Sequence, residues 1–317
     1  MQQLQSGRHF LQIPGPTNVP DRILRAIERP TIDHRGPEFK GLCFEVLEGI
    51  KEIFQTREPV IIYPASGTGA WEAALVNTHT SGERVLMYDT GHFASTWHKL
   101  ATKLGLDAQL LPGSWREGVR PDEIEQALSE DKDRNIKSVC VVHNDTATGI
   151  TSDIPAIRKA IDKSGHNALL CVDTISSLGS IDYRHDDWGV DVTVGGSQKG
   201  LMLPAGLSFN AVSKKALAAC ESANLPSSYW DWQDMLNANK GGVFPFTPAT
   251  NLLYGLREAI RMLLEEGLDQ VFYRHRRLAD AARAAVKAWE LELNALNPGE
   301  YSNSLTAILL PQGHDAD

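Results

Sequence analysis

The chain has 317 residues, of which 42% are hydrophobic and 22% are charged. This length is enough for two domains, and the composition is that of a globular protein, not of a disordered, collagen-like or disulfide-scaffold chain. The 31 basic and 40 acidic residues give a net charge of −9, which argues against nucleic acid as a partner.

The first 20 residues are rich in Pro and Gly and predict an extended segment. After it, short apolar runs alternate with amphipathic stretches. The expected strands span residues 60–63, 84–89, 108–111, 138–143, 168–173, 190–195 and 207–211, and the expected helices span 37–54, 70–78, 93–104, 121–128, 154–163 and 213–221. Strands that are apolar on both faces and alternate with helices favour an α/β fold with a mainly parallel, seven-stranded sheet covered by helices.

After Pro248 the pattern changes to two long helices, over residues 251–266 and 268–290, and a strand over 304–310. These elements indicate the start of a smaller α+β domain. We therefore expect an N-terminal extended segment over residues 1–20, a large domain over 21–266, and a small C-terminal domain over 267–317 that is truncated.

The four cysteines, Cys43, Cys140, Cys171 and Cys220, have no C-x-x-C spacing, so the sequence predicts neither a zinc site nor a redox motif, and we expect no metal. Cysteines in apolar runs are typical of buried free thiols in a reducing compartment. The sequence also shows no transmembrane stretch and no secretory signal. We expect a cytoplasmic protein that does not bind membranes.

Polar residues follow three of the expected strands at the edge where ligands bind in open parallel sheets. The strand over 60–63 leads into the loop 66–69 (SGTG) and then a helix, whose N-terminus can hold a phosphate. The strand over 168–173 ends in Asp173, and the strand over 190–195 leads into Lys199. The loop completes neither a P-loop nor a dinucleotide motif. Taken singly, these features are also those of a capped turn, a capping aspartate and a surface lysine.

Taken together, a phosphate-binding loop, an acid and a lysine match the needs of pyridoxal phosphate. This cofactor requires a lysine for its Schiff base, an acid that keeps its pyridine nitrogen protonated, and donors for its phosphate. A nicotinamide enzyme would need neither Lys199 nor Asp173 in this arrangement. A nucleotide-binding or regulatory protein on a doubly wound sheet is the alternative from another class.

At these residues the chain resembles the class V, fold-type I aminotransferases, above all the serine–glyoxylate and alanine–glyoxylate enzymes, with aspartate–glyoxylate enzymes close by. The matching stretches are residues 14–20 (PGPTNVP), 33–39 (DHRGPEF), 66–69 (SGTG), 143–149 (HNDTATG), 173–177 (DTISS), 196–199 (GSQK) and 246–248 (FTP). They follow the family's order and span nearly the whole chain.

The resemblance implies a role for each matching residue. Lys199 is expected to form the Schiff base and to move the proton between Cα and the cofactor's C4′, and Asp173 to pair with the ring nitrogen. The residues expected to bind the cofactor besides these two are Ser66, Gly67, Thr68, Phe93, Thr146, Thr148, Gln198 and Thr247. Thr247 is expected to reach the phosphate of the neighbouring subunit, because the family's sites are shared across a homodimer. Phe93 is expected to stack on the ring, with core packing as its alternative.

The resemblance also implies transamination with glyoxylate as the amino acceptor. Residues 7–14 (GRHFLQIP) and 228–232 (SYWDW) favour L-serine as donor, giving hydroxypyruvate and glycine; alanine and aspartate are alternatives. A cysteine desulfurase is an alternative with the same fold. It would need a reactive cysteine on a mobile loop, and the four cysteines do not suggest one. The family binds the substrate carboxylate with an arginine in a C-terminal Arg-Ile-Gly-His-type stretch. No such stretch occurs in residues 1–317. A non-catalytic fragment that binds the cofactor is therefore a further alternative, and Arg35 is a cation without an assigned role.

Overall fold

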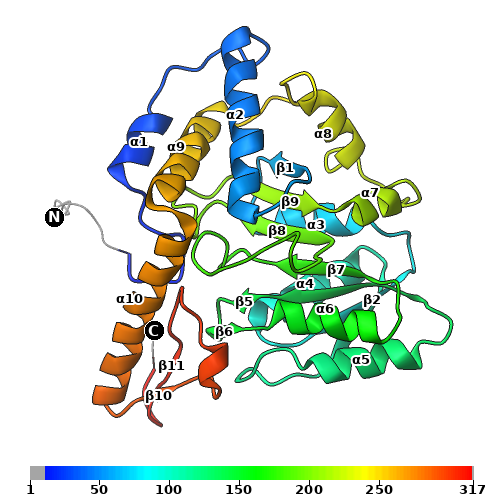
Figure 1. Ribbon diagram of the computed structural model, residues 1–317, viewed down its shortest axis with the longest axis vertical. Coiled ribbons are helices and arrows are strands. Elements are labelled where there is room, and N and C mark those ends of the chain that lie inside the picture. The colour runs from blue at the N-terminus through cyan, green and yellow to red at the C-terminus, as the bar shows by residue number, and fades with distance from the viewer. Residues whose placement is uncertain (1–10, 316–317) are drawn as a thin grey trace, which may run out of the picture.

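In the computed structural model, which describes residues 11–315, one seven-stranded sheet forms the centre of the molecule (Figure 1). Its order is β1 (Val60–Tyr63), β9 (Ser208–Val212), β8 (Val192–Gly196), β7 (Leu169–Asp173), β4 (Ile136–Val142), β2 (Arg84–Tyr88) and β3 (Asp107–Leu111). Strand β9 runs antiparallel to both of its neighbours, and the remaining pairs are parallel. The predicted mainly parallel sheet is confirmed, and every strand lies within about two residues of its predicted bounds.

The expected helices are all present. They are α2 (Pro37–Phe54), α3 (Gly67–Val76), α4 (His92–Lys103), α5 (Pro121–Glu130), α6 (Ile154–Lys163), α7 (Lys214–Cys220), α9 (Thr250–Glu266) and α10 (Leu268–Ala288). Two further helices, α1 (Asp21–Ile27) and α8 (Trp232–Asn239), are not anticipated by the sequence patterns. Helix α3 begins at Gly67 and not at residue 70, because the small-residue loop forms its first turn. No helix within residues 11–315 is long and apolar enough to cross a membrane.

The two faces of the sheet are covered by different helices. Leu170 and Val172 of β7 pack in the layer of α5 and α6, whereas Cys171 belongs to the core that contains α3 and α4. Because side chains alternate along a strand, Asp173 lies on the same side as Cys171. The end of β7 therefore presents its carboxylate toward α3.

A short hairpin follows β4. Strands β5 (Asn144–Asp145) and β6 (Ile150–Thr151) pair antiparallel, where the sequence pattern indicates only a loop. Gly149 closes the turn with a φ of 67°, a conformation that favours glycine, and a Cβ there would lie 3.1 Å from the backbone nitrogen of Ala307. The hairpin therefore links the end of β4 to the C-terminal segment.

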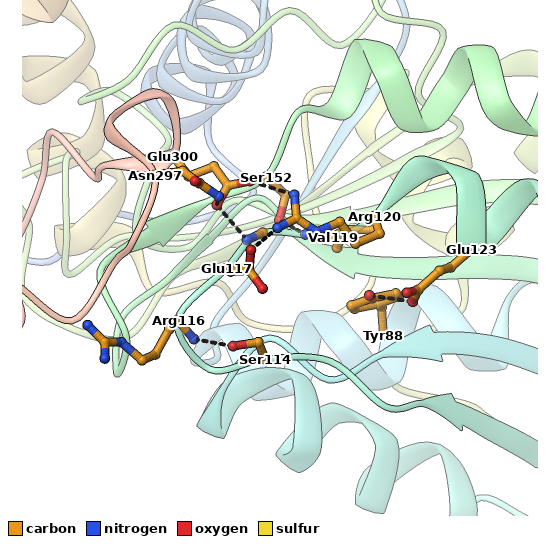
Figure 2. Close-up of polar contacts among 11 residues, drawn as sticks. Tyr88, Ser114, Arg116, Glu117, Val119, Arg120, Glu123, Ser152, Asn297 and Glu300 are labelled. Atoms are coloured by element: carbon orange, nitrogen blue, oxygen red, sulfur yellow. Dashed lines mark hydrogen bonds and ion pairs between the residues drawn. The ribbon is translucent and has the colours of Figure 1, made fainter.

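The C-terminal segment consists of α10, the 3₁₀ turn η1 (Pro298–Glu300) and the pair β10 (Glu292–Leu293) and β11 (Ile308–Leu309). The strand predicted over 304–310 is thus only two residues long. Figure 2 shows the contacts that join this segment to the loop before α5. Glu300 accepts hydrogen bonds from Gly118 N at 3.0 Å and from Arg120 at 3.3 Å, and Asn297 donates to the same carboxylate at 3.0 Å. The expected domain division stays a prediction.

The described part of the N-terminal segment has no regular secondary structure and reaches the loop after β8. Residues 11–20 form neither helix nor strand, whereas residues 1–10 of the predicted extended segment lie outside the described residues. Within this segment, residues 14–17 pack against the loop after β8 and are called the strap below. Thr17 N donates to Gln198 O at 3.0 Å, and the Thr17 hydroxyl donates to Lys199 O at 3.2 Å.

Candidate active site

A cavity of about 260 Å³ lies at the carboxyl ends of β1, β4, β7 and β8. It is lined by Gly15, Pro16, Ser66, Gly67, Thr68, Trp71, Phe93, Val142, Asn144, Thr146, Asp173, Ile175, Ser176, Gln198, Lys199 and Ala205. Eight of the ten predicted site residues are in this lining; Thr148 and Thr247 are not. Segments far apart in the sequence, from Gly15 to Ala205, therefore meet where the sequence predicts a ligand.

The N-terminus of α3 forms one wall of the cavity. The first N–H groups of a helix have no partner within it, and the Ser66 side chain does not cap them. Gly67 lies against Ile175, and a Cβ at Gly67 would lie 2.1 Å from Ile175 Cδ1. The backbone N–H groups of Gly67 and Thr68 and the Thr68 hydroxyl have no partner among the described residues and are available to an anion.

Asp173 lies at the end of β7 and is almost fully buried. Its Oδ2 accepts a hydrogen bond from Trp71 Nε1 at 2.9 Å, and its Oδ1 accepts one from Ile175 N at 2.7 Å. Burial raises the pKa of Asp173 to about 7; Asp145 acts in the same direction, and the two hydrogen bonds and Lys199 oppose it. A cation beside this carboxylate would therefore keep it ionised at neutral pH.

Lys199 follows β8, and its Nζ donates a hydrogen bond to the Pro14 carbonyl of the strap. Burial lowers the pKa of Lys199, while Asp173 opposes that effect. Gly15 has a φ of 138°, and a Cβ there would lie 2.6 Å from both Cδ and Cε of Lys199. The strap therefore contacts the lysine along its side chain, and the positive φ together with this close contact favours glycine at residue 15.

Aromatic rings form the wall near α4. Phe93 is the second residue of the helix, and its ring centroid lies 6.4 Å from that of Trp71, which in turn stacks on Trp97 at 5.7 Å. The Asp145 carboxylate accepts hydrogen bonds from the backbone N–H groups of Phe93 and Ala94, at 3.2 and 3.4 Å. A carboxylate at a helix N-terminus is favourable, so Asp145 fixes the start of α4 and thereby the Phe93 ring.

The three predicted threonines occupy different places. Thr146 lines the cavity, whereas Thr148 is buried outside the lining and its hydroxyl donates to Thr90 O at 3.3 Å. Thr247 is exposed, next to Phe246, whose ring stacks on Tyr229 with centroids 4.4 Å apart. The predicted roles of Thr148 at the cofactor ring and of Thr247 in a partner's site stay predictions.

Several lining residues were not predicted, among them Trp71, Asn144 and Ser176. Trp71 follows Gly67 by four positions, which places both on one side of α3. Asn144 donates to the Ser176 hydroxyl at 3.0 Å and to the Ser304 hydroxyl at 3.1 Å, and so joins the cavity to the C-terminal segment. Asn144 and Ser176 stand inside the stretches that carry the resemblance, and this position is the signal that could have found them.

The lining fits pyridoxal phosphate. The uncapped end of α3 suits a phosphate, the Asp173 carboxylate suits a protonated ring nitrogen, and Lys199 supplies an amine. The Gln198 side chain lines the cavity and makes no hydrogen bond to the described residues, which leaves its NH2 group free to donate to a phosphate. None of the four cysteines lines the cavity.

Comparisons with known proteins agree with this geometry. The family model "Aminotransferase class-V" matches residues 9–317. A serine–glyoxylate aminotransferase of Methylorubrum extorquens is 49% identical over 98% of this chain and 79% of its own length. An L-aspartate–glyoxylate aminotransferase of Paracoccus denitrificans is 45% identical over 96% of this chain and 77% of its own.

A solved structure gives the same result. The alanine–glyoxylate aminotransferase of Nostoc sp. is 28% identical and superposes with a TM-score of 0.91, covering 99% of this chain and 83% of that one. The comparisons confirm the predicted family, enzyme class and cofactor. This chain belongs to the class-V aminotransferases, pyridoxal phosphate enzymes of fold type I.

Proposed function

We propose that this aminotransferase transfers the amino group of L-serine to glyoxylate and releases hydroxypyruvate and glycine. The observation that carries the proposal is the meeting of Lys199, Asp173 and the uncapped N-terminus of α3 in one cavity. Three of the relatives are named serine–glyoxylate aminotransferases, at 49%, 46% and 42% identity. The aspartate–glyoxylate relative shares the same acceptor, so glyoxylate is the better supported half of the proposal.

Five residues of the cavity have an assigned task in this proposal. Pyridoxal phosphate, when bound, supplies an electron-withdrawing ring that makes the Cα proton of an amino acid acidic. Ser66, Thr68 and Gln198 hold its phosphate together with the N-terminus of α3, and Asp173 keeps the proton on its ring nitrogen. Lys199 Nζ accepts the proton from the substrate's Cα, and its lowered pKa favours the neutral amine that this step needs.

A second cavity of about 300 Å³ shares Ser176 and Lys199 with the first and suits the substrate. It is lined by Pro14, Thr17, Asn18, Ser176, Ser180, Lys199, Gly200, Met202, Leu263, Arg274, His275 and Ser304. The hydroxyls and the Asn18 amide suit the hydroxyl of a serine side chain. Arg274 is held by Glu266 through two hydrogen bonds of 2.7 and 2.9 Å. An aspartate side chain would have to compete with Glu266 for this cation, which favours serine over aspartate.

The proposal includes a homodimer with shared sites. Thr247 is exposed, and the stacked pair of Tyr229 and Phe246 beside it presents partly exposed aromatic surface. A partner subunit that covers these rings would bring Thr247 to the phosphate of the neighbouring site. Static light scattering of the cofactor-saturated protein measures the assembly, and a monomer that binds one cofactor per chain would contradict the shared site.

The catalytic proposal is tested with the purified protein and added pyridoxal phosphate. We expect a visible absorbance band that serine removes and glyoxylate restores, with glycine as the product. Borohydride reduction should attach the cofactor to Lys199, and Lys199→Ala should abolish this attachment. Lys214→Ala, at a lysine that is 87% exposed, is the matched control and should change nothing. A higher kcat/KM for alanine or aspartate would overturn the choice of donor, and labelling of another lysine would overturn the site.

A further inference from the structure

Each oxygen of the Asp173 carboxylate accepts a hydrogen bond, one from a helix far away in the sequence and one from the turn that follows β7. Trp71 Nε1, from α3, donates to Oδ2 at 2.9 Å, and Ile175 N donates to Oδ1 at 2.7 Å. We propose that Trp71 is a positioning residue that holds the Asp173 carboxylate in one orientation, toward the ring nitrogen of the cofactor. The inference rests on the proposed role of Asp173 and extends it to a residue that lies 102 positions away in the sequence.

Trp71 is suited to this task because its ring is packed in the core. The residue is only 1% exposed, and its indole stacks on Trp97 with an interplanar angle of 11°. By contrast, the terminal torsion of an aspartate is broad and does not select one orientation by itself. Two donors on opposite oxygens remove that freedom. The hydrogen bond from the packed indole therefore fixes the orientation of the carboxylate.

The hydrogen bond also acts on the charge of Asp173. The charged and titratable groups that face it are Asp145, from the hairpin after β4, Lys199, from the loop after β8, and Tyr183. Tyr183 is neutral because burial raises its pKa. Burial and Asp145 favour the protonated acid, whereas Lys199 and the two N–H donors favour the carboxylate. Without the Trp71 N–H, a smaller fraction of Asp173 would be ionised at neutral pH.

The chain offers a matched control in the same stacked pair. Trp97 Nε1 is buried and has no hydrogen-bond partner among the described residues. Trp71→Phe and Trp97→Phe remove the same atoms from two rings that stack on each other. Only the first substitution removes a donor from Asp173.

The experiment measures the dissociation constant of pyridoxal phosphate from the full chain by equilibrium dialysis between pH 6 and 9. Affinity of the unmodified protein should rise as Asp173 loses its proton, and Asp173→Asn should lack this step. Trp71→Phe should weaken binding at pH 7.5 by roughly tenfold or more and move the midpoint of the step to higher pH. Trp97→Phe keeps an aromatic ring against Trp71 and should leave both the dissociation constant and the midpoint unchanged.

Equal effects of the two Trp→Phe substitutions, or an unchanged midpoint in Trp71→Phe, would overturn the inference. If Trp71→Phe does not fold, 3-benzothienylalanine at position 71 keeps the two-ring shape and replaces the N–H with sulfur, and the same shift is expected. A pH step that survives in Asp173→Asn would instead remove the proposed role of Asp173, and with it the inference. The two failures are therefore distinguishable.

Discussion

Asp173→Asn should make the cofactor-free protein more stable at pH 8, although it removes the acid that we propose as the partner of the cofactor's ring nitrogen. The folded-state pKa of Asp173 is about 7, against 3.8 for the group in its ordinary state, because the carboxyl is buried. A raised folded-state pKa means that the native state binds the proton more tightly than the unfolded chain does. Its stabilising contribution is complete below about pH 4 and is lost as the pH rises through 7.

The magnitude follows from the two pKa values. A difference of about 3 units corresponds to ~4 kcal/mol of unfolding free energy lost between pH 4 and pH 7. Asparagine carries no charge and avoids this loss. Its amide offers only one acceptor oxygen, so either Trp71 Nε1 or Ile175 N loses its partner, which costs about 1–3 kcal/mol. The variant should therefore be more stable by ~1–3 kcal/mol at pH 8 and less stable at pH 4.

The assay is urea unfolding of the cofactor-free protein and the variant at several pH values between 5 and 8. The difference in unfolding free energy should change by about 2–3 kcal/mol between pH 5 and pH 7. Saturation with pyridoxal phosphate should restore the advantage of the unmodified protein, because a ligand stabilises the state that binds it more tightly. A difference that stays constant over this pH range would show that Asp173 remains ionised in the folded protein, and would refute the reasoning.

Three further substitutions test the walls of the site. Gly15→Ala should lower kcat with serine by on the order of 10²-fold, because the new Cβ displaces the Lys199 side chain; steady-state kinetics measure this, and an unchanged kcat would contradict it. Gly67→Ala should weaken cofactor binding because its Cβ meets Ile175, whereas Gly41→Ala, with no atom within 4 Å of its Cβ, should not; equilibrium dialysis compares the two. Thr247→Ala should reduce the rise in melting temperature that added cofactor causes, and an identical rise in both proteins would show that this hydroxyl does not reach a cofactor.

The strands and most helices were predictable because burial leaves a regular mark on the sequence. Strand β7 is buried at every position and reads as an apolar run that ends in Asp173. Helix α1 has only one buried residue, Ile23, and its N-cap is Pro20, which offers no capping side chain. Periodicity and capping are therefore both too weak there to indicate a helix. Strand β11 was predicted as too long for a related reason. Only Ile308 and Leu309 pair with another strand, and so short a pairing leaves no clear alternation in the sequence.

Much of the site lining was predictable because the carboxyl ends of parallel strands meet at one edge of the sheet. This rule brings Lys199 and Asp173 together without knowledge of any distance. The partners of these residues were not predictable in the same way. The bond from Trp71 to Asp173 depends on the rotational phase of α3, and the contact of Gly15 with Lys199 depends on the path of a segment without regular structure. Neither contact produces a local pattern in the amino-acid sequence.

The strap has a consequence for how the protein is made. Its hydrogen bonds to the loop after β8 join residues that are 181 to 185 positions apart. At about 5–20 residues per second, a ribosome needs roughly 10–40 s to extend the chain from the strap to Lys199. During this interval the strap has no loop to pack against, and the cofactor site lacks Lys199. Cofactor binding therefore cannot precede synthesis of the loop after β8, and it requires that these two distant segments have already met.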